Sequence, residues 1–117
     1  MCQAKINEFN ASEGTNVDLK TANVLGDLSD AIKLAPRNAY LYYNRGNLYA
    51  QRGDNNRAIS DYSQALTLNQ DLAEAWYNRG LAKIFAKHVD EGVEDLSKAG
   101  ELGLYQAYSV IKKYRDK

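Results

Sequence analysis

The sequence predicts an all-α fold of stacked antiparallel helix pairs, because two short motifs recur with one common period. The first motif combines an aspartate, a large residue, a serine and an alanine. It occurs three times, each copy 34 residues after the last: Asp27-Leu28-Ser29 with Ala31, Asp61-Tyr62-Ser63 with Ala65, and Asp95-Leu96-Ser97 with Ala99. The second motif repeats at the same spacing, as Tyr43-Asn44-Arg45-Gly46 and Tyr77-Asn78-Arg79-Gly80. A fixed period of this size indicates stacked structural units.

Large and small residues alternate within the central unit in a way that lets two helices pack closely. Counted from Ala39, large residues stand at the fourth, eleventh and twenty-fourth places, and small residues at the eighth, twentieth and twenty-seventh. The large residues are Tyr42, Tyr49 and Tyr62, and the small ones are Gly46, Ala58 and Ala65. Small residues let the two backbones approach, and the tyrosines fill the remaining volume.

This pattern of places resembles that of the tetratricopeptide repeat (TPR) family. The resemblance covers roughly residues 17 to 115 and implies a right-handed superhelical stack of antiparallel helix pairs with a C-terminal capping helix. One departure is that Lys87-His88 stands where the central unit has Gly53-Asp54. The first unit matches only in its second half.

The apolar pattern and the breakers place the helices in order along the chain. Thr15 with Asp18 resembles a capping box at the start of the first helix, and Pro36 ends that helix because it disfavours helical geometry at the residue before it. Gly53 supplies the stop for the second helix. The expected helices span about 17–34, 39–51, 55–68, 72–86, 89–102 and 104–115.

The domain prediction follows from these elements. Residues 1–16 are polar and are expected to form a leader or a degenerate first helix. Residues 17–117 form one TPR domain, and its parts are a partial unit at 17–38, full units at 39–72 and 73–106, and a capping helix at 104–115.

The composition excludes several classes of function. Fifteen basic and fifteen acidic residues cancel, so no large field attracts nucleic acid. No stretch approaches the roughly 18 apolar residues of a membrane span, and no secretory signal is recognisable. A cytoplasmic protein is therefore expected. A Met followed by Cys2 is also what remains when a lipoprotein signal is deleted, so a lipid-anchored or exported protein is the alternative.

No constellation of residues suggests catalysis, a metal or another cofactor. His88 is the only histidine, and it falls in an expected turn. Ser29, Ser63 and Ser97 recur with the period, which marks them as architecture, because the repeat would not triplicate a nucleophile. We therefore expect a protein that is not an enzyme and that holds no metal.

Charged residues also recur with the period, and they suggest a ladder of ion pairs between units. Arg45 and Arg79 need an acid if they are partly buried. The pairs Asp27–Arg45, Asp61–Arg79 and Asp95–Lys113 are all separated by 18 residues and give every aspartate a partner. Pairing within a unit would leave Asp27 opposite Ala11. The sequence therefore favours pairing between units, and solvated surface charges remain the alternative.

The resemblance also implies where a partner would bind. In the family, the first helix of each pair lines a concave groove, and tyrosine and asparagine side chains suit peptide recognition. Several of these tyrosines could instead simply pack between neighbouring helices. The candidate binding residues carried over to the groove are Tyr40, Tyr43, Asn44, Asn47, Gln51, Tyr77, Asn78, Leu81, Ile84, Phe85, Tyr108 and Lys112. Ala50, Glu74, Ile111 and Arg115 occupy further places that face the same groove.

Some family members hold the C-terminal acid of chaperones in a carboxylate clamp. Asn47, Asn78 and Lys112 match three of the five places of this clamp, but Tyr43 and Tyr108 replace its two lysines. Losing two cations removes most of the charge-assisted hold on a carboxylate. A partly apolar partner is therefore favoured over a chaperone tail.

Together these observations predict a protein-interaction scaffold that binds a peptide segment or a partner surface in its groove. The alternative is a structural module that self-associates through its terminal helices. In that case a homo-oligomer is expected.

Overall fold

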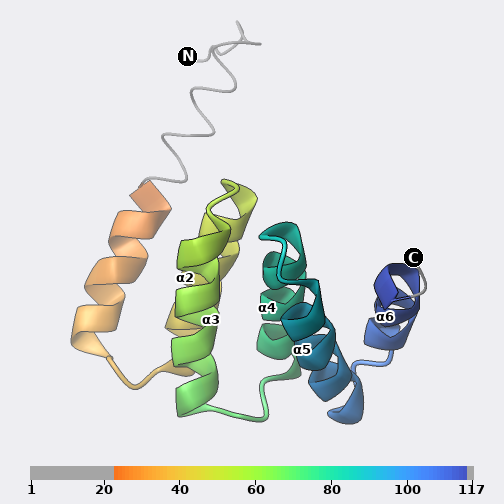
Figure 1. The fold of residues 1–117 in the computed structure, drawn as a ribbon. Coiled ribbons are helices and arrows are strands. Elements are labelled where there is room, and N and C mark those ends of the chain that lie inside the picture. The colour runs from red at the N-terminus through yellow and green to blue at the C-terminus, as the bar shows by residue number, and fades with distance from the viewer. Residues whose placement is uncertain (1–22, 116–117) are drawn as a thin grey trace, which may run out of the picture.

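The computed structural model describes residues 23–115, and these residues confirm the all-α prediction. Residues 23–34 form a helix, and no strand occurs between residues 23 and 115. Five more helices follow: α2 (Ala39–Gln51), α3 (Asn55–Leu68), α4 (Ala73–Phe85), α5 (Val89–Glu101) and α6 (Gln106–Arg115). They lie side by side in chain order, as Figure 1 shows, with α2 packed on α3, α3 on α4, α4 on α5 and α5 on α6. The predicted leader and the capping box at Thr15 fall outside the described residues.

The two turns inside the helix pairs have the same backbone geometry although their sequences differ. Gly53 closes the first turn with a φ of +80°. Lys87 takes the equivalent place in the second turn with a φ of +76°, in the left-handed region that favours glycine. Backbone hydrogen bonds hold both turns, from Asp54 N to Tyr49 O at 2.9 Å and from His88 N to Lys83 O at 2.7 Å. The turn therefore has the same geometry with lysine as it has with glycine.

Glycines let the two helices of each pair touch along their backbones. A Cβ atom added at Gly46 would lie 2.8 Å from the ring of Tyr62. A Cβ atom added at Gly80 would lie 2.7 Å from the carbonyl oxygen of Gly92 and 3.0 Å from Leu96. Both glycines are buried, so the small residues of the repeat sit in the tight helix contacts for which the pattern predicts them.

An aromatic side chain at the fourth place of each full unit forms a hydrogen bond with the backbone of the loop that precedes its helix. Tyr42 donates a hydrogen bond from its hydroxyl to the carbonyl oxygen of Pro36, at 3.2 Å. In the next unit, Trp76 donates from Nε1 to the carbonyl oxygen of Gln70, at 2.8 Å. Both bonds span six residues, so two different aromatic residues perform one architectural role.

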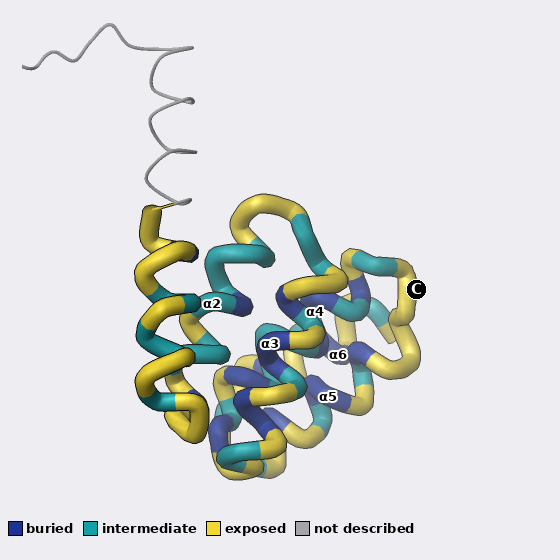
Figure 2. The backbone as a smooth tube through the Cα atoms, turned by 90° about the vertical axis from the view of Figure 1, so that its left-hand side faces the viewer, coloured by how far each residue is buried: buried dark blue, intermediate teal, exposed yellow. Residues whose placement is uncertain are grey.

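Buried residues run through the middle of the stack, and its first helix is mostly exposed. Figure 2 shows the buried segments concentrated along α3, α4 and α5, whereas the backbone of residues 23–34 is largely exposed. Tyr62 and Leu96 are the largest fully buried side chains of the described residues. They occupy the same place in successive units, so one large residue per unit fills the gap between paired helices.

The C-terminal helix covers the last pair. Ala107 and Ile111 of α6 are buried against Leu96, Ala99 and other residues of the α4–α5 pair. Tyr114 stands where the earlier units have Gly46 and Gly80. A bulky residue at that place prevents a further helix from approaching α6 as closely as α3 approaches α2. These contacts support a capping role for α6.

The ion pairs form within the units, so the predicted ladder between units is wrong. Arg45 donates to Asp61 from Nε at 2.7 Å and from Nη2 at 2.9 Å. Arg79 contacts Asp95 in the same bidentate way, at 2.8 and 2.9 Å. Counting partners misled the prediction, because the arginine of a first helix faces the aspartate of the second helix packed against it.

The predicted pairs at the two ends of the ladder, Asp27–Arg45 and Asp95–Lys113, do not form either. Asp27 is exposed, whereas Asp61 and Asp95 are only 6% and 4% exposed. Asp95 forms its second ion pair with Lys83, at 3.0 Å, and Lys113 instead lies over the ring of Tyr114.

Each of these arginines also contacts the preceding unit, through a serine and not through an aspartate. The Nη1 atom of Arg45 donates to the hydroxyl of Ser29 at 3.2 Å, and Nη1 of Arg79 donates to Ser63 at 2.9 Å. Each arginine thus bonds an aspartate 16 residues after it and a serine 16 residues before it. The recurring aspartate and serine are both partners of one arginine position.

We expect Gly80→Ala to destabilise the protein because the new Cβ atom has no room beside Gly92. Overpacking of this kind costs about 1 to 3 kcal/mol. Gly26→Ala is the control, since nothing lies within 4 Å of its Cβ position in the helix of residues 23–34. It should stabilise by about 0.5 to 1 kcal/mol through helix propensity. Urea unfolding of both variants measures the effects, and equal midpoints would contradict the close approach.

We expect Arg79→Ala to lower the free energy of unfolding by about 1 to 3 kcal/mol, because it removes two hydrogen bonds to the buried Asp95 and leaves Lys83 as its remaining ionic partner. Arg57→Ala is the control, since its pair with Asp54 is solvated, with 71% of the Arg57 side chain exposed. It should cost less than about 1 kcal/mol. Denaturant unfolding compares the two, and a loss at Arg79 no larger than that at Arg57 would refute the structural role of the bidentate pair.

Candidate functional site

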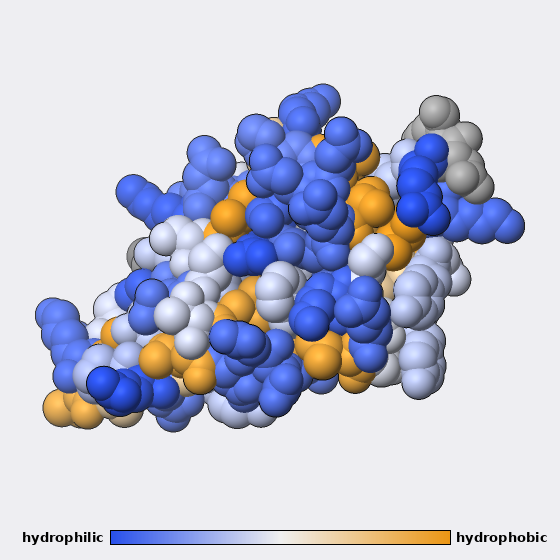
Figure 3. Space-filling view, turned by 60° about the horizontal axis from the view of Figure 1, so that its bottom comes forward, coloured by the Kyte–Doolittle hydropathy of each residue, from blue (hydrophilic) through white to orange (hydrophobic). Residues whose placement is uncertain are grey.

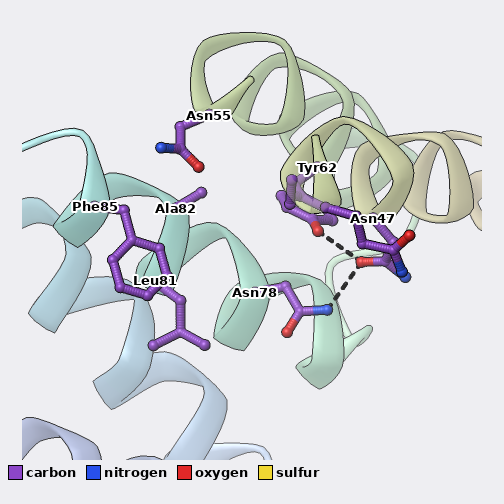
Figure 4. Close-up of a pocket in the computed structure, with 9 residues that line it drawn as sticks. Asn47, Asn55, Tyr62, Asn78, Leu81, Ala82 and Phe85 are labelled. Carbon is purple, nitrogen blue, oxygen red and sulfur yellow. Dashed lines mark hydrogen bonds between the residues drawn. The ribbon is translucent and has the colours of Figure 1, made fainter. Parts of the chain in front are cut away.

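A pocket of about 350 Å³ opens between α2, the start of α3, and α4. Figure 4 shows its polar and apolar side chains from these three helices. The residues that line it are Asn47, Ala50, Gln51, Asn55, Tyr62, Asn78, Leu81, Ala82 and Phe85. Five of the twelve candidate binding residues from the sequence are among them, namely Asn47, Gln51, Asn78, Leu81 and Phe85, together with Ala50, whose place also faces the groove. The pocket therefore lies on the face where the resemblance places the groove.

Four side chains at one edge of the pocket form a hydrogen-bonded group that we call the amide cluster: Tyr43, Asn47, Tyr62 and Asn78. Asn47 accepts two hydrogen bonds at Oδ1, from the Tyr62 hydroxyl at 2.6 Å and from Asn78 Nδ2 at 3.0 Å. Asn78 Nδ2 also donates to the Tyr43 hydroxyl, at 3.2 Å. The rings of Tyr43 and Tyr62 pack at a tilt, with their centroids 5.9 Å apart. The cluster joins both helix pairs, because Asn47 lies on α2 and Asn78 on α4.

The Tyr62 hydroxyl is part of the hydrogen bonding of both amides. Burial raises the pKa of this hydroxyl well above the ordinary value, and Tyr43 beside it raises the pKa further. The hydroxyl therefore stays protonated, and it donates to Asn47 Oδ1. Asn78 Nδ2 donates to that same oxygen. The position of Tyr62 depends in turn on Gly46, since any side chain there would collide with its ring.

This arrangement leaves one amide donor and one amide acceptor unused. Among the described residues, Asn47 Nδ2 and Asn78 Oδ1 form no hydrogen bond. Both residues are half-buried and line the pocket. A peptide group has one N–H donor and one C=O acceptor, so the two free amide groups match the hydrogen-bonding capacity of a main chain.

The far side of the pocket is apolar and the whole pocket lacks charge. Leu81, Ala82 and Phe85 of α4 lie together on it, and Ala50 of α2 is a further apolar lining residue. Phe85 is 59% exposed, which is high for a large aromatic side chain beside a pocket. None of the nine lining residues is ionisable except the tyrosine, which stays neutral. The pocket thus combines an uncharged polar edge with an apolar wall.

The other residues predicted for the groove have different surroundings. Ile84 is only 6% exposed and packs with Leu96 in the core, so we leave it out of the proposed binding surface. Tyr77 packs on the edge of the same core cluster. Tyr40, Asn44, Tyr108 and Lys112 are exposed on α2 and α6, outside the lining of the pocket.

Sequence reasoning missed three residues of the pocket: Asn55, Tyr62 and Ala82. Tyr62 was expected only to fill the core, and its ring does so, but its hydroxyl reaches the amide cluster. Asn55 and Ala82 come from the start of α3 and from the buried side of α4. The available signal was the choice of tyrosine over leucine at position 62, since a buried tyrosine hydroxyl needs a partner.

The described part of the chain contains neither a candidate membrane-spanning helix nor a candidate metal site. Within residues 23–115 no helix has both the length and the apolar character needed to cross a bilayer. In the same part of the chain, no three His, Cys, Asp or Glu side chains gather where they could hold a metal ion.

Two family models match the chain, and curated proteins with related sequences exist. A model described as "Tetratricopeptide repeat" matches residues 28–60, and one described as "TPR repeat" matches residues 46–83. Photosystem I assembly protein Ycf3 of Acaryochloris marina is 30% identical over 94 residues, which cover 78% of this chain and 57% of the relative. TPR repeat-containing thioredoxin TDX of Arabidopsis thaliana is 35% identical over 75 residues, 64% of this chain and 20% of the relative. The chain thus spans about half or less of these relatives' lengths.

Solved structures share the fold. The first TPR of Spaghetti (RPAP3), bound to the HSP90 peptide SRMEEVD, superposes with a TM-score of 0.77 at 22% identity, covering 86% of this chain and 82% of that one. MamA superposes with a TM-score of 0.70 at 26% identity, covering 83% of this chain and 57% of that one.

We expect the two asparagines of the amide cluster to respond differently to the same substitution. Asn47→Asp keeps both accepted hydrogen bonds and should change the free energy of unfolding by less than about 1 kcal/mol. Asn78→Asp removes both donated bonds and sets a carboxylate against the Asn47 oxygen, which should cost about 1 to 3 kcal/mol. Denaturant unfolding at neutral pH measures the pair. Equal losses, or a larger loss at Asn47, would show that the amides are oriented the other way.

Proposed function

The chain is a tetratricopeptide repeat protein, and from this premise we propose that it is an interaction scaffold that binds an extended segment of a partner protein along α2 and α4. The observation that carries the proposal is the amide cluster. It holds one donor and one acceptor free in a pocket between the two helix pairs. Such a pair can hydrogen-bond the main chain of any extended segment.

The comparisons support a protein as the partner. The first TPR of Spaghetti (RPAP3), which has the same fold, is bound to a peptide of HSP90. One relative, 39% identical over 61 residues, is named as a TPR and J domain-containing co-chaperone of Cryptococcus neoformans, and those residues cover 52% of this chain and 11% of that protein. Ycf3 is named as an assembly protein. These proteins are thus a TPR bound to a peptide, a co-chaperone and an assembly protein.

A chaperone tail is not the partner that we propose. Tyr43 and Tyr108 stand at the two places where the resemblance would require lysines for a carboxylate clamp, and Tyr43 is already engaged with Asn78. Without those cations, a terminal carboxylate would lack the charge-assisted hydrogen bonds that repay its desolvation. The free groups of the amide cluster instead fit an uncharged main chain.

Self-association through the terminal helices has weaker support. Leu34 and Tyr105 are strongly exposed near the two ends of the described stack. On the face shown in Figure 3, however, hydrophobic residues form separate small groups between hydrophilic ones. Stable interfaces between identical chains are usually larger and more continuously apolar.

We expect Asn47→Asp to weaken peptide binding about tenfold while leaving the fold intact, because it replaces the free amide donor with an acceptor. The probes are peptides selected from a phage-displayed random 12-residue library on the wild-type chain, with affinities measured by calorimetry. Asn69→Asp is the matched control. Asn69 lies at the end of α3, outside the pocket, and its Oδ1 accepts from Asp71 N, a bond that aspartate keeps.

The control should bind these peptides with wild-type affinity. If Asn47→Asp also binds them with wild-type affinity, the amide cluster takes no part in recognition and the proposal fails. Light scattering of the unbound chain at several concentrations tests self-association, which predicts that the mean mass rises with concentration.

A further inference from the structure

We infer that the pocket beside the amide cluster selects one uncharged, apolar side chain of the bound segment, of about the size of leucine, isoleucine or methionine. The inference rests on the proposed function and adds the chemical class of the residue that is recognised. The occupant is thus an internal, extended stretch of a partner protein with an apolar anchor residue.

The pocket offers no charge to a bound side chain. No lining residue is charged, and the three cations within α2 and α4 already form ion pairs. Arg45 and Arg79 are each engaged with an aspartate, and Lys83 lies 3.0 Å from Asp95. A charged side chain placed in the pocket would lose water without gaining an ionic partner, which is unfavourable. A neutral pocket therefore discriminates against acidic and basic anchors alike.

The apolar wall of the pocket favours an apolar side chain. Phe85 is more than half exposed, and it borders the pocket together with Leu81 and the small residues Ala50 and Ala82. Because the side chains of the two alanines are small, room remains in the pocket beside Leu81 and Phe85. A volume of about 350 Å³ lies at the small end of the range for ligand pockets, so it has room for one large side chain together with the main chain that carries it. Covering the exposed ring with an apolar side chain supplies the favourable burial.

The amide cluster and the apolar wall lie next to each other, so one extended segment can contact both. Figure 4 shows Asn78 between Asn47 on one side and Leu81 on the other, with Phe85 beyond Leu81. Asn78 and Leu81 are three residues apart on α4 and so share one face of the helix. In an extended chain, alternate side chains point to opposite sides. A main chain bonded to the amide cluster can therefore place one side chain on the apolar wall while its neighbours point away.

A reversal of specificity tests this inference. The probes are the library-selected 12-residue peptides, prepared with acetylated and amidated ends so that no terminal charge contributes. We expect the selected sequences to share one apolar position, at which a change to aspartate weakens wild-type binding about tenfold or more. Leu81→Lys should reverse this order, because it places a cation on the apolar wall, so the aspartate peptide should bind that variant more tightly than its parent does.

Leu34→Lys is the matched control. It makes the same change at a leucine that is 88% exposed and lies outside the pocket, and it should leave the wild-type order of affinities unchanged. Circular dichroism melting of both variants checks that the fold is retained. Phe85→Ala is a second variant whose side chain is mostly exposed, and it should weaken the apolar peptides without affecting the order at any other position.

The outcomes separate this inference from the proposed function. If Asn47→Asp weakens binding but the selected peptides share no apolar position, the pocket lacks the selectivity inferred here and the proposed function stands. If neither Asn47→Asp nor Leu81→Lys affects binding, or if no peptide binds below about 1 mM, the proposed function fails and the inference with it. A concentration-dependent dimer that Leu81→Lys abolishes would show that a second copy is the occupant and would overturn the inference.

Discussion

The close approach of paired helices at Gly46 and Gly80 is the constraint on which the rest of the structure depends. With a side chain at either glycine, the facing helix would have to move away, since the added Cβ would meet Tyr62 or the Gly92 backbone. The approach brings the arginine of each first helix within hydrogen-bond distance of the aspartate on its partner. It also sets the Tyr62 hydroxyl beside Asn47. Packing, ion pairing and the amide cluster thus share one geometric origin.

The ion pairs show how far the sequence alone can be taken. Its period identified the arginines and aspartates as structural residues, and both aspartates that have an arginine are buried. The choice of partner could not be read from the period, because any two periodic positions keep a constant separation whether or not they touch. Asp27 illustrates the difference. The residue 16 places before it is Ala11, not arginine, and Asp27 is exposed.

The helices were predictable from local signals, and the tight contacts from places that recur in the sequence. Breakers such as Gly53 act over a few residues, and the small residues of the helix contacts stand at fixed places of the repeat, so both leave a pattern that can be counted. The amide cluster depends instead on hydrogen bonds between side chains 15 to 35 residues apart. Such bonds require the positions of three helices to be known to within an ångström or so. The family pattern therefore predicted the face on which the pocket opens, whereas the residues that share hydrogen bonds on it needed the structure.

The candidate site arises where successive units differ from one another. One period after Asn47, Tyr62 and Asn78 the chain has Leu81, Leu96 and Lys112. Leucines at the first two places cannot form an amide cluster, so the polar edge does not recur at the next junction of the described stack. The same difference supplies part of the apolar wall, because Leu81 stands one period after Asn47. Residues that keep the period build the stack, and residues that depart from it give one junction a chemistry that its neighbours lack.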